Sequence, residues 1–246
     1  HSGARAPLEI AKHLAKRGNK IVIFAYDNNL DEKVMADLKK SNCEVVLIAK
    51  PKILFIGKYA VIPKVAQLLK RYAPDVMYFS GTPPFFLAGK LTGIPIVRIY
   101  MGTQFDAFLE RKTPDQSVNI LERLINKLLN VYIYLADFIS FRLSTGIVAI
   151  SKYSAREGET LYKRKVDSII YLGTTLFPQK NVYPKQQDGK VHLLSVSRIT
   201  PYKGFHLIIE AIKKAKTKKE IIFTIVGSKP KENYVAYLKK IGGKNV

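Results

Sequence analysis

Short apolar runs alternate with helical patterns along most of the chain. The runs have the length and the nearly continuous apolar character of strands that are buried on both faces of a parallel sheet. Strands are predicted at residues 21–26, 44–49, 76–80, 95–100, 146–151, 168–173, 191–197 and 220–227. Apolar positions between them recur at helical spacing and predict helices at residues 7–17, 31–40, 61–73, 83–93, 117–143, 204–216 and 232–242. This alternation favours an α/β fold with doubly wound parallel sheets.

The alternation is interrupted between residues 174 and 190, where two prolines, a glycine and three lysines replace the apolar periodicity. Such a composition is typical of a linker. We therefore expect a first domain at residues 1–178, a linker at 179–190 and a second domain at 191–246. The second domain has only two predicted strands, which is fewer than a stable sheet of this kind needs. The sequence thus predicts that the second domain is incomplete.

The charge of the chain points to anionic partners. The 246 residues carry a formal net charge of +22, which favours nucleic acid, acidic lipid headgroups or phosphorylated small molecules. The single cysteine, Cys43, excludes an intrachain disulfide and a cysteine-based metal site, and the four histidines are scattered. We expect no metal, no cofactor and a reducing compartment.

The stretch SVSRITPYKGF, residues 195–205, places two cations on a short bend between a strand and a helix. Arg198 ends the predicted strand, and Lys203 lies in the loop that follows. Ligands of parallel sheets bind at loops after the carboxyl ends of strands, and a helix N-terminus attracts phosphate. Gly204 would let the backbone approach a ligand closely. The spacing predicts a phosphate or diphosphate site but also fits two solvated surface charges.

Residues 195–212 resemble the start of the second domain in family 4 glycosyltransferases of GT-B fold. The similarity extends over residues 1–24, 74–104, 146–158, 168–178 and 223–227. The resemblance implies two Rossmann-like domains, of which the first lacks its first strand and the second ends before the family's paired glutamates. It also implies a hexosyltransferase-type enzyme that moves a sugar from a nucleotide-diphosphate-sugar donor to an acceptor glycan, lipid-linked sugar or small molecule, with retention and without a metal.

The resemblance assigns roles to individual residues. Arg198 and Lys203, with Gly204, match the positions that hold the donor diphosphate, on which negative charge builds as the sugar leaves. Further positions are expected in the loops of the cleft: Gly3, Gly102, Thr103, Gln104, Ser151, Gly173 and Gly227. Met101 stands where the family commonly has a histidine, so either Thr103 or Gln104 supplies that contact or catalysis is impaired. No catalytic residue is identified, and a non-catalytic protein of the same fold stays open.

The apolar helix predicted at residues 117–143 has two interpretations. A core helix is favoured by its many large apolar side chains. The alternative is an interfacial helix on an anionic membrane, helped by nearby cations: Arg111, Lys112, Arg123, Lys127 and Arg142. Its most lipid-like part, residues 128–141, is too short to span a bilayer. We expect a cytoplasmic protein, with peripheral attachment to the inner face of the membrane as the interfacial alternative.

Nucleic-acid binding is the competing class of function. The net charge permits it, but the cations are spread along the chain and are not interleaved with aromatic residues in a stacking pattern. The sequence therefore favours a nucleotide sugar over nucleic acid as the partner.

Overall fold

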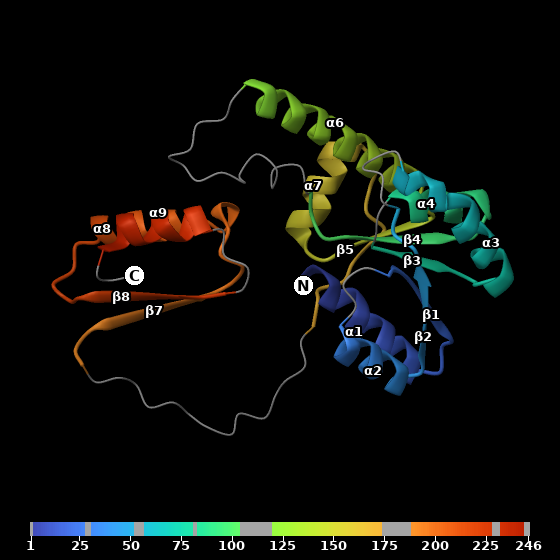
Figure 1. Ribbon diagram of the computed structural model, residues 1–246, viewed down its shortest axis with the longest axis horizontal. Helices are drawn as coiled ribbons and strands as arrows, with labels where there is room; N and C mark the ends of the chain where they lie inside the picture. The colour runs from blue at the N-terminus through green and yellow to red at the C-terminus, as the bar shows by residue number, and fades with distance from the viewer. Residues whose placement is uncertain are drawn as a thin grey trace. The chain divides into compact units, whose positions relative to one another are not determined.

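The computed structural model describes residues 2–27, 31–51, 57–80, 83–103, 120–173, 188–227 and 232–243. The chain divides into two compact units (Figure 1). Unit 1 comprises residues 1–102 and 136–174, and unit 2 comprises residues 103–135 and 175–246. Each unit is an arrangement of parallel strands and helices, as the alternating pattern predicts.

The strands of unit 1 form two parallel sheets. The first pairs β1 (Ile21–Tyr26) with β2 (Cys43–Ile48). The second has the order β3-β4-β5-β6, with bounds Met77–Phe79, Ile96–Tyr100, Gly146–Ala149 and Ser168–Ile169. Each strand lies within or next to a predicted apolar run, although β6 is shorter than expected. Continuous apolar runs are therefore sufficient to locate these strands.

The helices of unit 1 connect these strands. They are α1 (Ser2–Lys16), α2 (Glu32–Lys40), α3 (Ile62–Tyr72), α4 (Pro83–Leu91), α6 (Ile120–Leu143, which begins in unit 2) and α7 (Lys152–Tyr162), with a 3-10 turn η1 at Gly57–Val61. Pro7 was expected in the first turn of this helix, but α1 already begins at Ser2, so Pro7 lies beyond the first turn. Helices α1 and α2 lie on one face of the β1–β2 pair and α3 lies on the other (Figure 1).

Helix α7 is absent from the sequence prediction. It begins at a capping box in which Ser151 and Ser154 bond each other's backbone N–H groups. Its buried face consists mostly of the small residues Ser154, Ala155 and Gly158. A Cβ atom at Gly158 would lie 2.9 Å from the Phe141 ring, so the helix packs closely against its neighbours. Because small residues make this face, no large apolar periodicity marks the helix.

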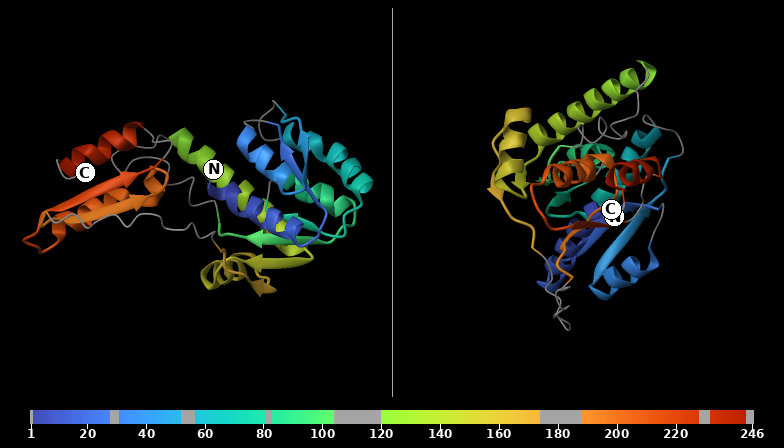
Figure 2. Two further views of the ribbon diagram at one scale, coloured as in Figure 1. Left: turned by 90° about the horizontal axis from the view of Figure 1, so that it is seen from below. Right: turned by 90° about the vertical axis from the view of Figure 1, so that its left-hand side faces the viewer.

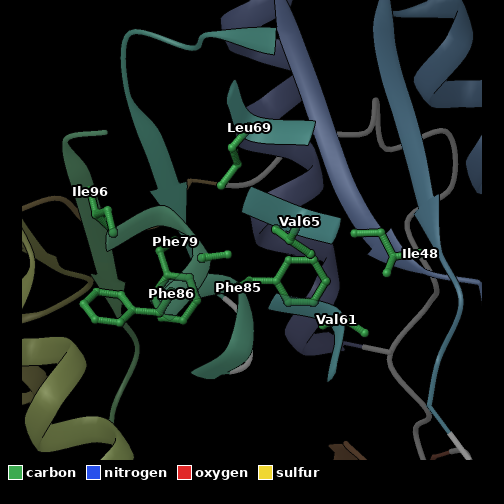
Figure 3. Packing of buried hydrophobic residues seen from close by; sticks show 9 residues of the cluster. Ile48, Val61, Val65, Leu69, Phe79, Phe85, Phe86 and Ile96 are labelled. Carbon is green, nitrogen blue, oxygen red and sulfur yellow. The ribbon is translucent and has the colours of Figure 1, made fainter. Parts of the chain in front are cut away.

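The core of unit 1 lies where α3 and α4 pack against the strands (Figure 3). Its buried members come from β2, β3, β4, the turn η1 and the two helices: Ile48, Val61, Val65, Leu69, Phe79, Phe85, Phe86, Ala88 and Ile96. A Cβ atom at Gly89 would lie 2.6 Å from the Met77 sulfur, which shows how closely α4 approaches β3. This burial orients the strands so that their carboxyl ends share one edge.

Helix α6 is continuous over its described length (Figures 1 and 2). Arg164 stabilises its C-terminus, since the guanidinium donates hydrogen bonds to the carbonyl oxygens of Phe141, Arg142 and Ser144. The expectation of a core helix holds only for one face, which buries Ser140 and Phe141. The opposite face exposes a stripe of apolar residues: Ile120, Leu121, Leu124, Ile125, Leu128, Val131, Leu135 and Ile139.

The described part of unit 2 contains one parallel pair of strands, β7 (Val191–Val196) and β8 (Ile221–Val226). The 3-10 turn η2 (Pro201–Lys203) leads into α8 (Phe205–Lys214), and α9 (Glu232–Gly242) follows β8. The two helices lie on the same face of the pair (Figure 1). Their core consists of Phe205, Ile209, Phe223, Tyr234 and Leu238.

The inner face of α8 buries Phe205 and Ile209, and Ile208 and Ile212 pack against them. The prediction that β7 is buried on both faces is wrong. Leu194 and Val196 are exposed because α8 and α9 cover the other face of the pair.

Candidate functional site

The charged groups of Arg198 and Lys203 both lie close to the ring of Tyr202. The Arg198 guanidinium carbon is 5.6 Å from the ring centroid, and the Lys203 Nζ atom is 5.1 Å from it. Arg198 also donates a hydrogen bond to the Tyr202 hydroxyl. Both cationic side chains are exposed to solvent. A cation over the face of an aromatic ring is stabilised electrostatically. The loop thus holds two accessible positive charges next to one aromatic side chain.

The backbone turns from η2 into α8 at Gly204. This residue has φ +71°, and its N–H donates to the Pro201 carbonyl oxygen at 2.9 Å. A Cβ atom there would meet only Leu207, at 3.6 Å, so the glycine is required by its conformation and not by lack of space. The turn places Lys203 immediately before the N-terminus of a ten-residue helix, where the helix dipole favours anions.

Gly227 lies beside the same loop. A Cβ atom at this position would overlap the Ser197 carbonyl oxygen, and the Ser197 N–H donates to the Val226 carbonyl oxygen at 3.0 Å. The carboxyl ends of β7 and β8 therefore approach closely only because residue 227 is glycine. This contact fixes the backbone that directly precedes Arg198.

The structure brings together several of the expected loop residues of unit 1. Gly102 follows β4, Ser151 follows β5 and Gly173 follows β6, and these strands are neighbours in one parallel sheet. Thr103 adjoins Gly102. The three loops therefore lie at one edge of the sheet, which is the ligand edge of such folds. Gly3 lies in the first turn of α1, and Gln104 lies outside the described residues.

Ser151 has a structural role in addition to its place at this edge. Its hydroxyl accepts a hydrogen bond from the Ser154 N–H at 3.0 Å and so caps α7. Gly102 has φ +121°, which a residue with a side chain rarely adopts. These two residues therefore shape the loops whether or not a ligand contacts them.

Sequence reasoning did not identify Glu157 on α7. A Cβ atom at Gly102 would lie 3.5 Å from the Glu157 carboxylate, so this acid adjoins the loop after β4. It accepts a hydrogen bond of 2.9 Å from the Tyr100 hydroxyl. Burial raises the pKa of Tyr100, and Tyr162 and Glu157 raise it further, so Tyr100 stays protonated as the donor. Only the prediction of a helix directly after Ser151 could have indicated that Glu157 lies close to this loop.

No cluster of histidine, cysteine, aspartate or glutamate that could hold a metal ion occurs within the described part of the chain.

The sequence matches the model of Glycosyltransferase Family 4 over residues 3–174. The chain belongs to this family. Residues 178–245 match a second model, Glycosyl transferases group 1. No curated protein matches the chain.

Solved glycosyltransferases share the fold at low sequence identity. HepE from Anabaena, solved in complex with UDP, is 17% identical with a TM-score of 0.63, and the match covers 98% of this chain and 62% of HepE. A glycosyltransferase from Rickettsia africae is 18% identical with a TM-score of 0.62, covering 96% of this chain and 60% of that protein. MurG from Acinetobacter baumannii is 14% identical with a TM-score of 0.51, covering 99% and 59%.

The expected GT-B fold is confirmed by these matches. The family 4 chain spans about three fifths of the length of the solved structures that it matches.

Proposed function

We propose that this family 4 chain binds a nucleotide-diphosphate sugar and takes part in transferring its hexosyl group to an acceptor glycan, lipid-linked sugar or small molecule. Transfer proceeds with retention and without a metal. In this proposal residues 1–178 form the acceptor side, residues 179–190 the linker and residues 191–246 the donor side. The observation that carries it is the gathering of Arg198 and Lys203 on the Tyr202 ring.

The two cations would act on the leaving group. When the bond between the sugar and the diphosphate breaks, negative charge develops on the diphosphate oxygens. A guanidinium and an ammonium that are already in place stabilise this charge without reorganisation. The N-terminus of α8 adds partial positive charge beside Lys203. HepE has been solved with UDP and also with UDP and glucose, which supports a uridine diphosphate as the first ligand to test.

The test is a calorimetric titration of the 246-residue chain with UDP. Arg198→Ala and Lys203→Ala should each weaken binding about 10-fold or more, because each removes a charge-assisted contact worth about 1.5–3 kcal/mol. Lys213→Ala is the matched control, since it removes the same charge from the last turn of α8. Equal weakening by all three variants would show that only the overall charge matters and would overturn the proposed site.

Tyr202 offers a second readout. Tyr202→Phe keeps the ring but removes the hydroxyl that accepts from Arg198, whereas Tyr202→Ala removes both. If the ring positions the cations, Tyr202→Ala should weaken UDP binding several-fold more than Tyr202→Phe. Unchanged affinity in Tyr202→Ala would show that the ring has no part in the site.

We also propose that α6 attaches the protein peripherally to an anionic membrane. None of the described helices is long and apolar enough to cross a bilayer. The exposed stripe of α6 nevertheless places eight large apolar side chains on one side of the helix, as in helices that lie in the membrane interface. The net charge of +22 is complementary to an anionic leaflet.

Sedimentation with vesicles tests this attachment. The chain should bind vesicles of phosphatidylglycerol and phosphatidylcholine more strongly than vesicles of phosphatidylcholine alone. The double variant Leu128→Ser/Leu135→Ser should reduce binding, whereas Leu91→Ser/Leu172→Ser should not, although Leu91 and Leu172 are also exposed. Equal loss in both variants, or no binding to either vesicle, would contradict the proposal.

A further inference from the structure

Exposed lysines gather at one edge of unit 2, at the amino ends of β7 and β8. Two belong to the last turn of α8 and two to the last turn of α9. Three more lie in the segment between α8 and β8, and all these side chains are exposed. We call this surface the basic edge, and its members are Lys213, Lys214, Lys216, Lys218, Lys219, Lys239 and Lys240.

The packing of α8 against α9 brings these lysines together. Near the N-termini of the two helices, the His206 N–H donates to the Tyr234 hydroxyl at 3.3 Å. Near their C-termini, Ile212 and Ile241 pack against the same core. The helices therefore run side by side in the same direction (Figure 1). Since α8 leads to the amino end of β8, both C-termini lie at this edge.

The carboxylates around the basic edge do not neutralise it. Within the described residues, none of the seven lysines forms an ion pair, and neither does Glu210, one turn before Lys213. Two carboxylates at the same edge have other partners. Glu220 pairs with Lys190 at 2.9 Å, and the Asp188 carboxylate lies 2.8 Å from the His192 ring. Like charges held close together repel one another, and an anionic partner relieves this repulsion.

Stabilisation of the helices accounts for only part of the basic edge. Cations in the last turn of a helix interact favourably with its dipole, which explains the four lysines of α8 and α9. Lys216, Lys218 and Lys219 lie beyond the end of α8. Their segment is held by local hydrogen bonds, in which the Thr217 N–H donates to the Ala215 carbonyl oxygen and the Lys219 N–H donates to the Thr217 hydroxyl. These three charges therefore have no part in capping a helix.

The composition of the basic edge indicates which kind of polyanion fits it. Sites for single-stranded nucleic acid combine cations with aromatic side chains that stack on bases, and arginine makes bidentate contacts to phosphate. The basic edge has neither arginine nor an aromatic residue. The nearby Tyr237 stacks on Tyr234 and packs against the core. Lysines on long stems, spread over two helix ends and a loop, suit a diffuse layer of headgroup phosphates.

We propose that the basic edge is a second membrane-contacting surface, which binds the phosphates of an anionic leaflet electrostatically. It lies at the opposite edge of the β7–β8 pair from Arg198 and Lys203, so lipid bound there leaves the candidate diphosphate site open. Binding needs no insertion of apolar side chains and is therefore reversible and strongly dependent on salt. The inference goes beyond the proposed function, because it rests neither on sugar transfer nor on the apolar stripe of α6.

Sedimentation of the 246-residue chain with vesicles of phosphatidylglycerol and phosphatidylcholine tests this surface. The loop variant removes the three charges that cap no helix: Lys216→Gln/Lys218→Gln/Lys219→Gln. The scattered control removes the same net charge from exposed positions of unit 1: Lys20→Gln/Lys90→Gln/Lys165→Gln. Thermal unfolding of both variants verifies that they fold as the parent does.

The loop variant should bind these vesicles at least about 10-fold more weakly than the parent, since each lysine at a membrane surface contributes about 5-fold in affinity. The scattered control should lose less than about 3-fold, because charges farther from the lipid than about 10 Å are screened at 0.1 M salt. Lys239→Gln/Lys240→Gln should weaken binding about 5-fold or more, since α9 belongs to the same surface. The loop variant should bind UDP as the parent does.

A second background separates the basic edge from α6. The loop variant should lower vesicle affinity by a similar factor when it is combined with Leu128→Ser/Leu135→Ser. If the leucine changes alone have no effect and the loop variant still weakens binding, the attachment through α6 fails and the basic edge stands. A parent chain that binds vesicles but not UDP would likewise contradict only the proposed sugar transfer.

Four results would overturn the proposal. The first is a parent chain that does not bind phosphatidylglycerol vesicles at 0.1 M salt. The second is equal weakening by the loop variant and the scattered control, which would show that only the net charge matters. The third is unchanged binding after the two lysines of α9 are replaced. The fourth is an oligonucleotide that binds the parent more tightly than the vesicles do and loses as much affinity in the loop variant, which would make nucleic acid the partner.

Discussion

The Arg98 guanidinium on β4 lies 2.6 Å from the Asp137 carboxylate on α6, and only 8% of the Arg98 side chain is exposed. The guanidinium also donates to the Asp137 carbonyl oxygen at 3.0 Å and to the Ser140 hydroxyl. The Tyr162 hydroxyl is 3.3 Å from the second oxygen of the same carboxylate. This network ties α6 and α7 to the sheet whose edge carries the candidate loops of unit 1.

Removing one partner of this pair should be strongly destabilising. Asp137→Ala leaves a buried guanidinium without its counter-charge, and we expect the free energy of unfolding to fall by about 3–5 kcal/mol. Urea denaturation measures this change. The double variant Arg98→Met/Asp137→Ala should recover part of the loss because no unpaired charge remains. Asp75→Ala, at an exposed position, is the control, and an equally large loss there would contradict the interpretation.

Gly227→Ala should destabilise unit 2. The added Cβ atom would overlap the Ser197 carbonyl oxygen, so the carboxyl ends of β7 and β8 must separate, at a loss of about 1–3 kcal/mol. Differential scanning calorimetry can follow the transition of unit 2. The matched variant Gly173→Ala places its Cβ where no atom lies within 4 Å, and it should leave stability nearly unchanged. If Gly227→Ala left the stability of unit 2 unchanged, this close approach would not exist in solution.

Gly204 permits a comparison between two substitutions. Its φ of +71° is unfavourable for alanine by about 1–2 kcal/mol, whereas asparagine tolerates the left-handed region better. Gly204→Ala should therefore lower the unfolding free energy more than Gly204→Asn. Chemical denaturation of both variants checks this order. The reverse order would show that the local space, and not the backbone conformation, selects glycine.

Tyr78 should make the protein less stable in alkali. Burial raises its pKa to about 12, from an ordinary value of 10.0. Below pH 10 the tyrosine is neutral in both states. Between about pH 10 and 12 the unfolded chain loses this proton while the folded chain keeps it. The folded state is therefore disfavoured as the pH rises, by up to about 3 kcal/mol above pH 12.

Tyr78→Phe should reduce this alkaline loss, measured by urea denaturation at pH 9 and pH 11.5. It should also leave stability at neutral pH unchanged or slightly higher, since it removes a buried hydroxyl without a partner. Tyr171→Phe alters an exposed side chain and serves as the control. A Tyr78→Phe protein with the same alkaline loss as the parent would refute the assignment to Tyr78.

The candidate site was predictable only in part. Arg198, Lys203 and Gly204 could be identified because they are close together between a clear strand and a clear helix, so local spacing suffices. The role of Tyr202 was not predicted, although it lies in the same loop, because its contacts with Arg198 and Lys203 depend on how the loop backbone folds. Glu157 was missed because helix α7 packs through small residues and carries no strong apolar period.

The sequence by itself determined the order of strands and helices and the family to which the chain belongs. Burial on two faces requires continuous apolar runs, burial on one helical face requires a period near 3.6 residues, and both patterns are local. Only the tertiary structure decided which distant residues meet. Arg98 and Asp137 are 39 positions apart, and no local pattern encodes their contact. The pairing of β1 with β2 and of β3 with β4 likewise arises in space, because a strand's sequence records that it is buried but not which strand lies beside it.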